Sequence, residues 1–398
     1  MKEDDGFPPA FAGVNPSYGA EFGAPMKITR IEPIAVALPM KKPVYMAGVE
    51  IRQADNVLVR LESDTGEIGW GEAASAPTMT GETVESMMAA IAYLMPAVLG
   101  RDPEDIAGAS KAMNGRMYGN QAAKAAVEIA LHDLVGRATG RPAHALLGGR
   151  VRDRLPVLAV ISNAEVAADL RAAAAMKAGG FTAFKIKVGV DKPLVDAERT
   201  RRVCEALGPG LLISADANTG WSTDEAVQYV RAIAGSGLTF FEQPVAADDV
   251  PGMAAVAAAA DCAIGADESI HSLADIRRHH DGRAARGVSL KTIKLGGMRG
   301  VLAAGRLCEE LGMSVNVACK TGESSIACAA GLHLAATLPA LAWGFTPSVE
   351  GLSEDVTGRP IRIERGHVEV SDRPGLGIDV DEDRVRRYRR DIAHRHVA

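Results

Sequence analysis

The first 150 residues change from a strand-like to a helix-like hydrophobic pattern. β-Branched and alternating apolar residues predict strands over residues 28–38, 56–62 and 68–72. Amphipathic patterns then predict helices over residues 81–99, 105–115 and 121–137. In the last of these, Val127, Ala130, Leu131 and Leu134 fall at i, i+3, i+4 and i+7, the spacing of a helix with one buried face. Strands followed by helices predict an α+β domain.

From about residue 150, short apolar segments alternate with helical ones. The expected strands are residues 155–161, 183–188, 211–215, 239–241, 263–266, 289–293 and 314–318. Helices are expected between most of them, for example over residues 196–207 and 224–235, the second opened by a capping box of Ser222 and Glu225. Repeated βα units predict an α/β fold with a parallel sheet, and seven or eight units close into a barrel.

The two patterns indicate two domains, which suits a chain of 398 residues. We expect a loose extension over residues 1–25, where Pro, Gly and Phe occur without periodicity. The α+β domain is expected over residues 26–150, the barrel over 151–345 and a C-terminal segment over 346–398.

Composition narrows the class of protein. The hydrophobic fraction is 47%, the net charge is −6, and no segment is obviously basic, which argues against nucleic acid as a partner. Five scattered cysteines without a CxxC pair indicate reduced thiols rather than a disulfide framework or a zinc site. The chain has no apolar run of about 18 residues and no secretory h-region, so we expect a cytoplasmic protein with no membrane partner.

Charged residues recur at a regular interval through the predicted barrel. Glu242 lies 26 residues after Asp216, Asp267 lies 25 after Glu242, and Lys291 lies 24 after Asp267. This interval is about one strand plus one helix, so each residue is expected near the carboxyl end of its own strand, where barrel enzymes place their chemistry. Taken singly, each acid could be a loop residue or a helix N-cap; the shared interval favours one site.

Three carboxylates and flanking lysines suit metal-assisted proton abstraction. Mg²⁺ prefers oxygen ligands, so Asp216, Glu242 and Asp267 are the expected ligands, with Mn²⁺ as the alternative ion. Lys185 and Lys187 are two apart in a strand and point to one face. A neighbouring ammonium and a metal are expected to lower the pKa of a lysine base. Such a set can remove a proton next to a carboxylate and stabilise the enediolate that forms.

Several motifs resemble the enolase superfamily, in its muconate-lactonizing subgroup. They are Phe184-Lys185-Ile186-Lys187, Ala215-Asp216-Ala217-Asn218 with Trp221, Phe241-Glu242-Gln243-Pro244, Ala266-Asp267-Glu268-Ser269, Leu290-Lys291 with Gly296-Gly297, and Glu323-Ser324-Ser325-Ile326. Two motifs of the first domain add to the resemblance: Lys124-Ala125-Ala126, and Leu146-Leu147-Gly148-Gly149, which ends the helical block. The resemblance covers about residues 27–380.

The resemblance implies a modified TIM barrel, (β/α)7β, with an N-terminal α+β capping domain that C-terminal residues complete. It implies Mg²⁺ on the three acids, Lys187 as base, Lys185 beside it, and Lys291 on the opposite face of the substrate. Asn218 and Glu323 would line the site, although a loop hydrogen bond and a helix cap are equally ordinary roles for them. Lid loops are expected over residues 40–50, with Tyr45 as a substrate contact, and over residues 73–81. Relatives are commonly dimers or octamers, so a homo-oligomer is expected.

The sequence departs from the subgroup in two places. Dipeptide epimerases carry an Asp-x-Asp pair after the last strand, and Trp343-Gly344-Phe345-Thr346-Pro347 lacks it, which disfavours that activity. Lys320 is an extra lysine near the expected site, where it would meet a second substrate carboxylate or lie in a solvated loop. The expected seventh strand has no histidine, which counts against mandelate-racemase-like and acid-sugar dehydratase chemistry.

An isomerase acting on a small carboxylate is therefore expected, first a muconate-type cycloisomerase. An amino-acid or N-acyl amino acid racemase or epimerase and an o-succinylbenzoate synthase-like syn dehydratase are the alternatives, because Lys187 and Lys291 permit two-base chemistry without requiring it. A catalytically silent binding scaffold is disfavoured because every expected ligand and lysine is retained.

Overall fold

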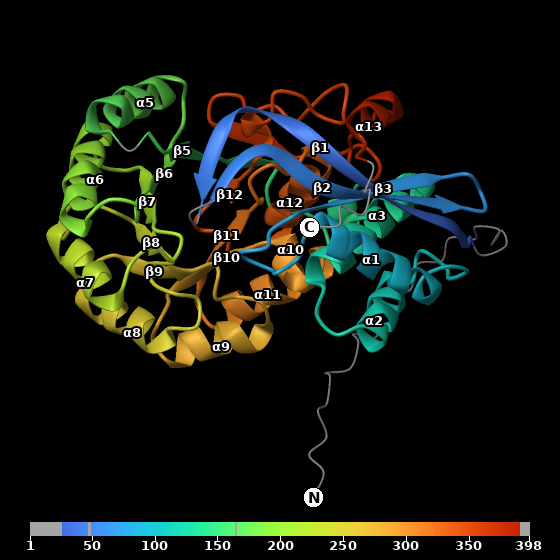
Figure 1. Ribbon diagram of the computed structural model, residues 1–398, viewed down its shortest axis with the longest axis horizontal. Helices are drawn as coiled ribbons and strands as arrows, with labels where there is room; N and C mark the ends of the chain where they lie inside the picture. The colour runs from blue at the N-terminus through green and yellow to red at the C-terminus, as the bar shows by residue number, and fades with distance from the viewer. Residues whose placement is uncertain (1–25, 47–48, 164, 391–398) are drawn as a thin grey trace, which may run out of the picture.

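The structure is a computed structural model that describes residues 26–46, 49–163 and 165–390. The expected extension at residues 1–25 lies outside the described ranges. Figure 1 shows two parts, a ring of helices around short strands and a neighbouring sheet with helices α1–α3 beside it.

The first part of the chain forms a three-stranded antiparallel sheet in the order β1-β2-β3. Its strands are β1 (Ile28–Met46), β2 (Val49–Ser63) and β3 (Ile68–Ala74). The helices that follow are α1 (Val84–Leu94), the 3-10 turn η1 (Met95–Ala97), α2 (Ile106–Arg116), α3 (Gln121–Thr139) and α4 (Ala143–Leu146). The predicted strands and helices of this region are thus present, although the segment predicted as one helix over 81–99 becomes α1 and η1.

Helix α3 differs from the amphipathic helix that its spacing predicts. Every residue from Ala122 to Gly136 is buried, including Lys124, Glu128 and Asp133. The helix packs against β2 and β3 on one side and against α10 and α11 on the other, so no face is left for solvent. Gly71 permits the close approach, since a Cβ there would lie 1.9 Å from the Ala126 carbonyl oxygen.

The second part is an eight-stranded parallel sheet in the order β5 to β12. Its strands are β5 (Leu158–Ile161), β6 (Ala183–Lys187), β7 (Leu212–Asp216), β8 (Phe240–Glu242), β9 (Ala263–Ala266), β10 (Gly287–Leu290), β11 (Ser314–Ala318) and β12 (Phe345–Thr346). The helices are α5 (Val166–Ala178), α6 (Pro193–Leu207), α7 (Thr223–Ala232), α8 (Val250–Ala259), α9 (Leu273–Asp281), α10 (Thr292–Leu295), α11 (Met298–Glu310) and α12 (Ser325–Thr337). A parallel bridge between Val157 and Phe345 brings the first and last strands together, which confirms the modified (β/α)7β barrel.

Three predicted segments need correction. The strand predicted over residues 289–293 ends at Leu290, and the short helix α10 begins at Thr292. The strand predicted over residues 155–161 is divided: β4 (Arg154–Pro156) pairs antiparallel with β13 (His367–Glu369), and only β5 joins the barrel. The division falls at Pro156, which has no N–H to continue a ladder. The described residues of the loop expected over 40–50 belong to a β-ribbon: β1 continues to Met46 and pairs with β2, which begins at Val49, after a register shift between Pro39 and Val44. Figure 1 shows this ribbon running from the sheet toward the barrel.

Residues near the C-terminus return to the first sheet, as the resemblance implies. Arg389 forms a bridge with Val36, and the Arg390 N–H donates to the Ala35 carbonyl at 2.8 Å. The helix α13 (Glu382–Tyr388) precedes them, and the 3-10 turn η2 (Val349–Gly351) leads to a bridge between Leu352 and Met40. No helix in the described ranges is long and apolar enough to span a membrane.

Candidate active site

Strand register aligns the predicted residues along one rim of the barrel. Lys187, Asp216 and Glu242 are the last residues of β6, β7 and β8, and they are direct register partners, Lys187 with Asp216 and Asp216 with Glu242. Asp267 and Lys291 come directly after β9 and β10. The regular sequence interval therefore corresponds to neighbouring carboxyl ends of barrel strands, and we call this edge the barrel rim.

Lys185 and Lys187 approach the carboxylates from β6. The Lys187 Nζ donates to Asp216 Oδ2 and to Asn218 Oδ1, each at 2.6 Å, and its side chain is 33% exposed. The Lys185 Nζ lies deeper, 2.5 Å from Glu242 Oε2 and 3.7 Å from Asp216 Oδ2, and its side chain is 4% exposed. Of the two ammonium groups, that of Lys187 is therefore the one within reach of a small molecule at the rim.

Asp267 lies between two lysines on the far side of the rim. The ammonium of Lys291 bonds to its Oδ2, and the ammonium of Lys294 lies 2.6 Å from its Oδ1. Lys294 is completely buried and also donates to the Ser289 carbonyl at 3.1 Å. Its position one turn beyond Lys291 in a short helix gave no sign in the sequence of a role at this site.

Asn218 and Gln243 organise the loops that follow β7 and β8. Asn218, at a left-handed φ of 42°, accepts from Lys187 and donates through Nδ2 to Glu268 Oε1 at 2.9 Å. The Gln243 side-chain oxygen accepts from the backbone N–H of Asp267 at 2.8 Å and from Ser269 Oγ at 2.7 Å. Gln243 and Glu268 stand in the motifs of the resemblance, but their contacts follow only from the folded loops.

The carboxylates and lysines change one another's pKa. Burial raises the pKa of Glu242 above its ordinary value despite the attraction of Lys185. Burial acts in the same sense on Asp216 and Asp267, but their lysine partners outweigh it and hold both pKa values below the ordinary range. For Lys185, burial is outweighed by Glu242 and Asp216, so its pKa is raised.

The pKa of Lys291 is likewise raised, because Asp267 outweighs burial. For both lysines, direct contacts with carboxylates thus outweigh burial. The expectation of a lowered pKa concerns a lysine base beside a bound metal, and it stays a prediction.

Lys320 and Glu323 lie in the loop between β11 and α12. The Lys320 side chain is buried, with a residue exposure of 7%, and its Nζ donates to the Thr321 carbonyl at 3.1 Å. Within the described residues it has no ion pair with a carboxylate. Burial is the largest influence on both groups: it lowers the pKa of Lys320 to about 8 and raises the pKa of Glu323 to about 8. The structure thus excludes the solvated-loop role for Lys320, since the lysine is buried.

Tyr45, the remaining predicted contact, lies at the end of β1. Its backbone pairs with Glu50 in β2, but its side chain lies outside the described part of the structure.

The donor set at the rim fits a hard divalent cation. Asp216, Glu242 and Asp267 are each at most 2% exposed, and Glu242 Oε1 is buried without a hydrogen-bond partner among the described residues. A buried carboxylate oxygen without a partner is costly unless a cation or donor meets it. In the described ranges no three acidic, His or Cys side chains already form a metal cluster, and the carboxylates instead face lysine ammonium groups. Oxygen ligands of this kind are those that Mg²⁺ and Mn²⁺ prefer.

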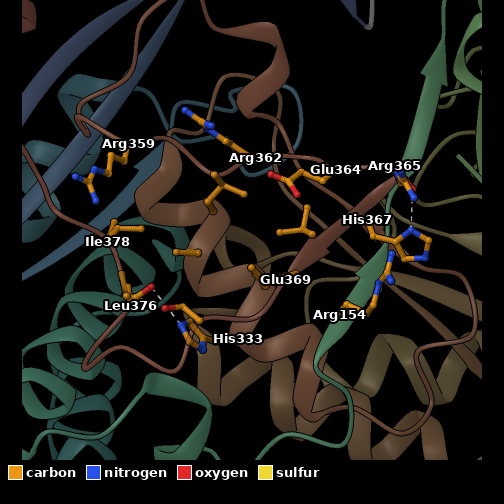
Figure 2. Close-up of a pocket in the computed structure, with 16 residues that line it drawn as sticks. Arg154, His333, Arg359, Arg362, Glu364, Arg365, His367, Glu369, Leu376 and Ile378 are labelled. Carbon is orange, nitrogen blue, oxygen red and sulfur yellow. Dashed lines mark hydrogen bonds between the residues drawn. The ribbon is translucent and has the colours of Figure 1, made fainter. Parts of the chain in front are cut away.

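A cleft of about 440 Å³ lies away from the rim. Figure 2 shows Arg154, Arg359, Arg362 and Arg365 around it and His333 at one side. The lining of this cleft comes from β4, α12 and residues 359–378, outside the strands of the barrel. It includes none of the predicted site residues.

Known families and relatives match almost the whole described chain. Residues 29–148 match the mandelate racemase / muconate lactonizing enzyme N-terminal domain, and residues 167–384 match the enolase C-terminal domain-like family. A chloromuconate cycloisomerase of Cupriavidus necator is 32% identical, covering 92% of this chain and all of the relative. The L-Ala-D/L-Glu epimerase of Bacillus subtilis is 33% identical, covering 89% of this chain and 97% of the relative.

The N-succinyl-L-Arg/Lys racemase of Bacillus cereus is 31% identical over 90% of this chain and 96% of its own length. A crystal structure of the N-succinyl Arg/Lys racemase from that organism superimposes with a TM-score of 0.86, covering 91% of this chain and 98% of the racemase. Cycloisomerases, racemases and epimerases are all isomerases. The chain thus belongs to the mandelate racemase/muconate lactonizing enzyme family and is an isomerase of the enolase superfamily.

Proposed function

We propose that this protein removes the proton next to a substrate carboxylate, through an enediolate, and that Mg²⁺ is its cofactor, with Mn²⁺ as the alternative ion. Members of this family generally use a divalent metal. Asp216, Glu242 and Asp267 would hold it, and the unpartnered Oε1 of Glu242 supports this choice. When bound, the ion supplies positive charge that stabilises the developing dianion.

The observation that carries the proposal is the placement of two lysines across the barrel. Lys187 ends β6 and Lys291 follows β10, and these strands are four positions apart in a barrel of eight. The carboxylates belong to the strands between them. A substrate carboxylate held above these acids would therefore present one face of its α-carbon to each lysine.

The remaining polar groups have distinct roles in this proposal. Lys187, the more exposed of the β6 lysines, acts as base on one face, and Lys185 compensates the charge of Glu242 beneath it. Asn218 accepts from Lys187 and so fixes the position of its ammonium. A cation that takes up the carboxylate oxygens would weaken their hold on the lysines and lower the pKa of the base.

The substrate is proposed to carry a second acidic group that binds Lys320. A buried ammonium without a carboxylate partner is costly, and an incoming carboxylate would complete it. Muconate-type cycloisomerisation is the first candidate, since chloromuconate cycloisomerase is among the relatives. From lactone to muconate this reaction begins with removal of the proton next to the carboxylate; from muconate to lactone, ring closure forms the enediolate and the lysine ammonium delivers that proton to the α-carbon. Racemisation of an N-acyl amino acid is the second, and it is favoured by the two lysines on opposite faces and by the racemase relative. Localisation in the cytoplasm and assembly into a homo-oligomer stay predictions from the sequence.

Product analysis separates these candidates. The protein with Mg²⁺ is incubated with cis,cis-muconate or chloromuconate, with N-succinyl-L-amino acids, and with an L-Ala-L-Glu dipeptide as a comparison substrate. A lactone from muconate identifies cycloisomerisation, whereas the D-isomer from an N-succinyl amino acid identifies racemisation. Turnover of the dipeptide alone would contradict the prediction that epimerase activity is disfavoured.

A further inference from the structure

Glu72 is a completely buried carboxylate from β3 that bonds to the start of a barrel helix. Its Oε1 accepts from the Ser324 N–H at 2.9 Å, and its Oε2 accepts from Ser324 Oγ at 2.6 Å and from the Ala327 N–H at 3.0 Å. Ser324 is the N-cap of α12, so a residue 252 positions earlier satisfies the free N–H groups of that helix. Negative charge at a helix N-terminus is also favoured by the helix dipole.

Asn56 on β2 extends the same contact to the loop before α12. Its Nδ2 donates to Glu72 Oε1 at 2.6 Å and to the Gly322 carbonyl at 2.8 Å. Gly322 has a φ of +92°, and a Cβ there would lie 2.7 Å from the Ala54 Cβ. The loop of residues 319–324 is therefore closely packed against the first sheet as well as hydrogen-bonded to it.

This loop carries two residues of the proposed site. The Lys320 N–H donates to Glu323 Oε2 at 2.9 Å, and Ser348 Oγ donates to the Glu323 carbonyl at 2.6 Å. Glu323 Oε1 is buried and has no hydrogen-bond partner among the described residues. The Lys320 ammonium donates to the Thr321 carbonyl and has no ion pair among the described residues. Together with the free acceptor of Glu323, it suits a substrate that has both a donor and an anionic group.

We propose that Glu72 is a positioning residue: from the first sheet it holds the loop of residues 319–324 so that Glu323 and Lys320 face the substrate. The inference rests on the proposed function for the roles of Glu323 and Lys320, whereas the hold on the loop is independent of it. The first sheet thus contributes to the site through a fixed part of the barrel.

The charge of Glu72 also acts on Glu323. Burial is the main reason that the pKa of Glu323 is raised to about 8, and Glu72 is the next; Lys320 and Lys291 act in the opposite sense. Burial likewise raises the pKa of Glu72 to about 7, against its bonds to Ser324 and Ala327. Removing the negative charge at position 72 should therefore lower the pKa of Glu323.

The test compares Glu72→Gln with Asp355→Asn. Asp355 is a matched control, because it is buried and its Oδ2 accepts from the Ser325 N–H at 3.1 Å and from Ser325 Oγ at 2.9 Å, at the same helix end. Glutamine keeps the shape of Glu72, but its amide nitrogen cannot accept from Ser324 or Ala327. Both variants should lose thermal stability to a similar extent.

Amide hydrogen exchange and the pH profile of kcat/KM distinguish positioning from stability. In Glu72→Gln the amides of Ser324 and Ala327 should exchange roughly ten- to hundred-fold faster, as for loss of buried hydrogen bonds. The limb of the profile near pH 8 should also move to lower pH, whereas Asp355→Asn should leave this limb in place. If Glu72→Gln does not fold, Asn56→Ala gives a second variant. It removes the Nδ2 bonds to Glu72 and Gly322 but keeps the bonds of Glu72 to Ser324 and Ala327, so faster exchange should be confined to residues 319–324.

Unchanged exchange at Ser324 and Ala327, or an equal shift of the pH limb in both variants, would overturn the proposal. If the wild-type protein turns over no carboxylate, the proposed function fails, while the exchange data still decide whether Glu72 holds the loop.

Discussion

Replacing Glu242 by Gln tests whether the buried carboxylates form a metal site. Lys185 Nζ lies 2.5 Å from Glu242 Oε2 and 3.7 Å from Asp216 Oδ2, and all three side chains are less than 5% exposed. Removing one partner of a buried ion pair costs about 3–5 kcal/mol. In Glu242→Gln, Asp216 still compensates the charge of Lys185, so the free energy of unfolding should fall by about 3 kcal/mol, the lower end of this range.

The response to Mg²⁺ separates metal binding from this general loss. At a Mg²⁺ concentration of about 100 times the dissociation constant, the wild-type protein should gain about 2.7 kcal/mol of stability. If the substitution weakens binding about 100-fold, the same Mg²⁺ concentration gives Glu242→Gln only about 0.4 kcal/mol. Urea titrations with and without Mg²⁺, together with calorimetric titration of the ion, measure both quantities.

Glu128→Gln is the control for the metal response. Glu128 is also buried, but it bonds to His132 and to the backbone of Met298 and Arg299 at the α3–α11 contact. This variant should lose stability and keep the full Mg²⁺ increment. An unchanged Mg²⁺ increment in Glu242→Gln would refute the assignment of Glu242 as a ligand.

Three further outcomes follow from the same contacts. Lys320→Met should lower kcat/KM for a dicarboxylate roughly ten- to hundred-fold, because a charge-assisted hydrogen bond is worth about 1.5–3 kcal/mol. The value of kcat/KM for a monocarboxylate analogue should stay unchanged. An equal loss for both substrates would contradict the proposal that Lys320 binds a second carboxylate. Burial raises the pKa of Glu72 to about 7 and that of Glu323 to about 8, above the ordinary value of 4.5. The folded protein therefore binds protons at these two groups more tightly than the unfolded chain does. Their contribution to the free energy of unfolding is complete below about pH 4.5 and is lost as the pH rises through 7–8. Urea titrations from pH 5 to 9 should show Glu323→Gln gaining on the wild-type protein as the pH rises, and a difference independent of pH would contradict this. Lys294→Met should lower the free energy of unfolding by about 3 kcal/mol, the lower end of the range, because Lys291 still pairs with Asp267. A change below about 1 kcal/mol in urea titrations would show that the contact is dispensable.

The alternating strand and helix patterns predicted the barrel, and the regular interval of charged residues predicted its rim. In a parallel barrel each βα unit adds about the same length of chain, so Asp216, Glu242, Asp267 and Lys291 fall at adjacent strand ends. Asp267 and Lys291 stand just beyond their strands, a difference of one residue that the interval does not resolve. The side-chain pairs among them depend on the folded loops and could not be read from spacing.

Contacts between the two parts of the chain were the main feature that the sequence did not predict. The pattern of α3 indicates one buried face, but its other faces are covered by α10 and α11, which lie far away in sequence. Glu72 lies in β3, and the sequence alone gives no sign that Ser324 and Ala327 bond to it. Lys294 is equally hidden, because its partner Asp267 belongs to another βα unit.

Deuterium exchange at the substrate α-carbon tests the central claim most directly. A substrate that the protein turns over is incubated in D₂O with Mg²⁺ and the wild-type, Lys187→Ala or Lys291→Ala protein, and mass spectrometry follows incorporation. The wild-type protein should incorporate deuterium, and Lys187→Ala should lose this exchange by roughly 10²–10⁴-fold while calorimetry shows Mg²⁺ still bound. If Lys291→Ala loses the exchange of only one enantiomer, the two-base reaction is supported. Full exchange in both lysine variants would contradict proton transfer by these lysines.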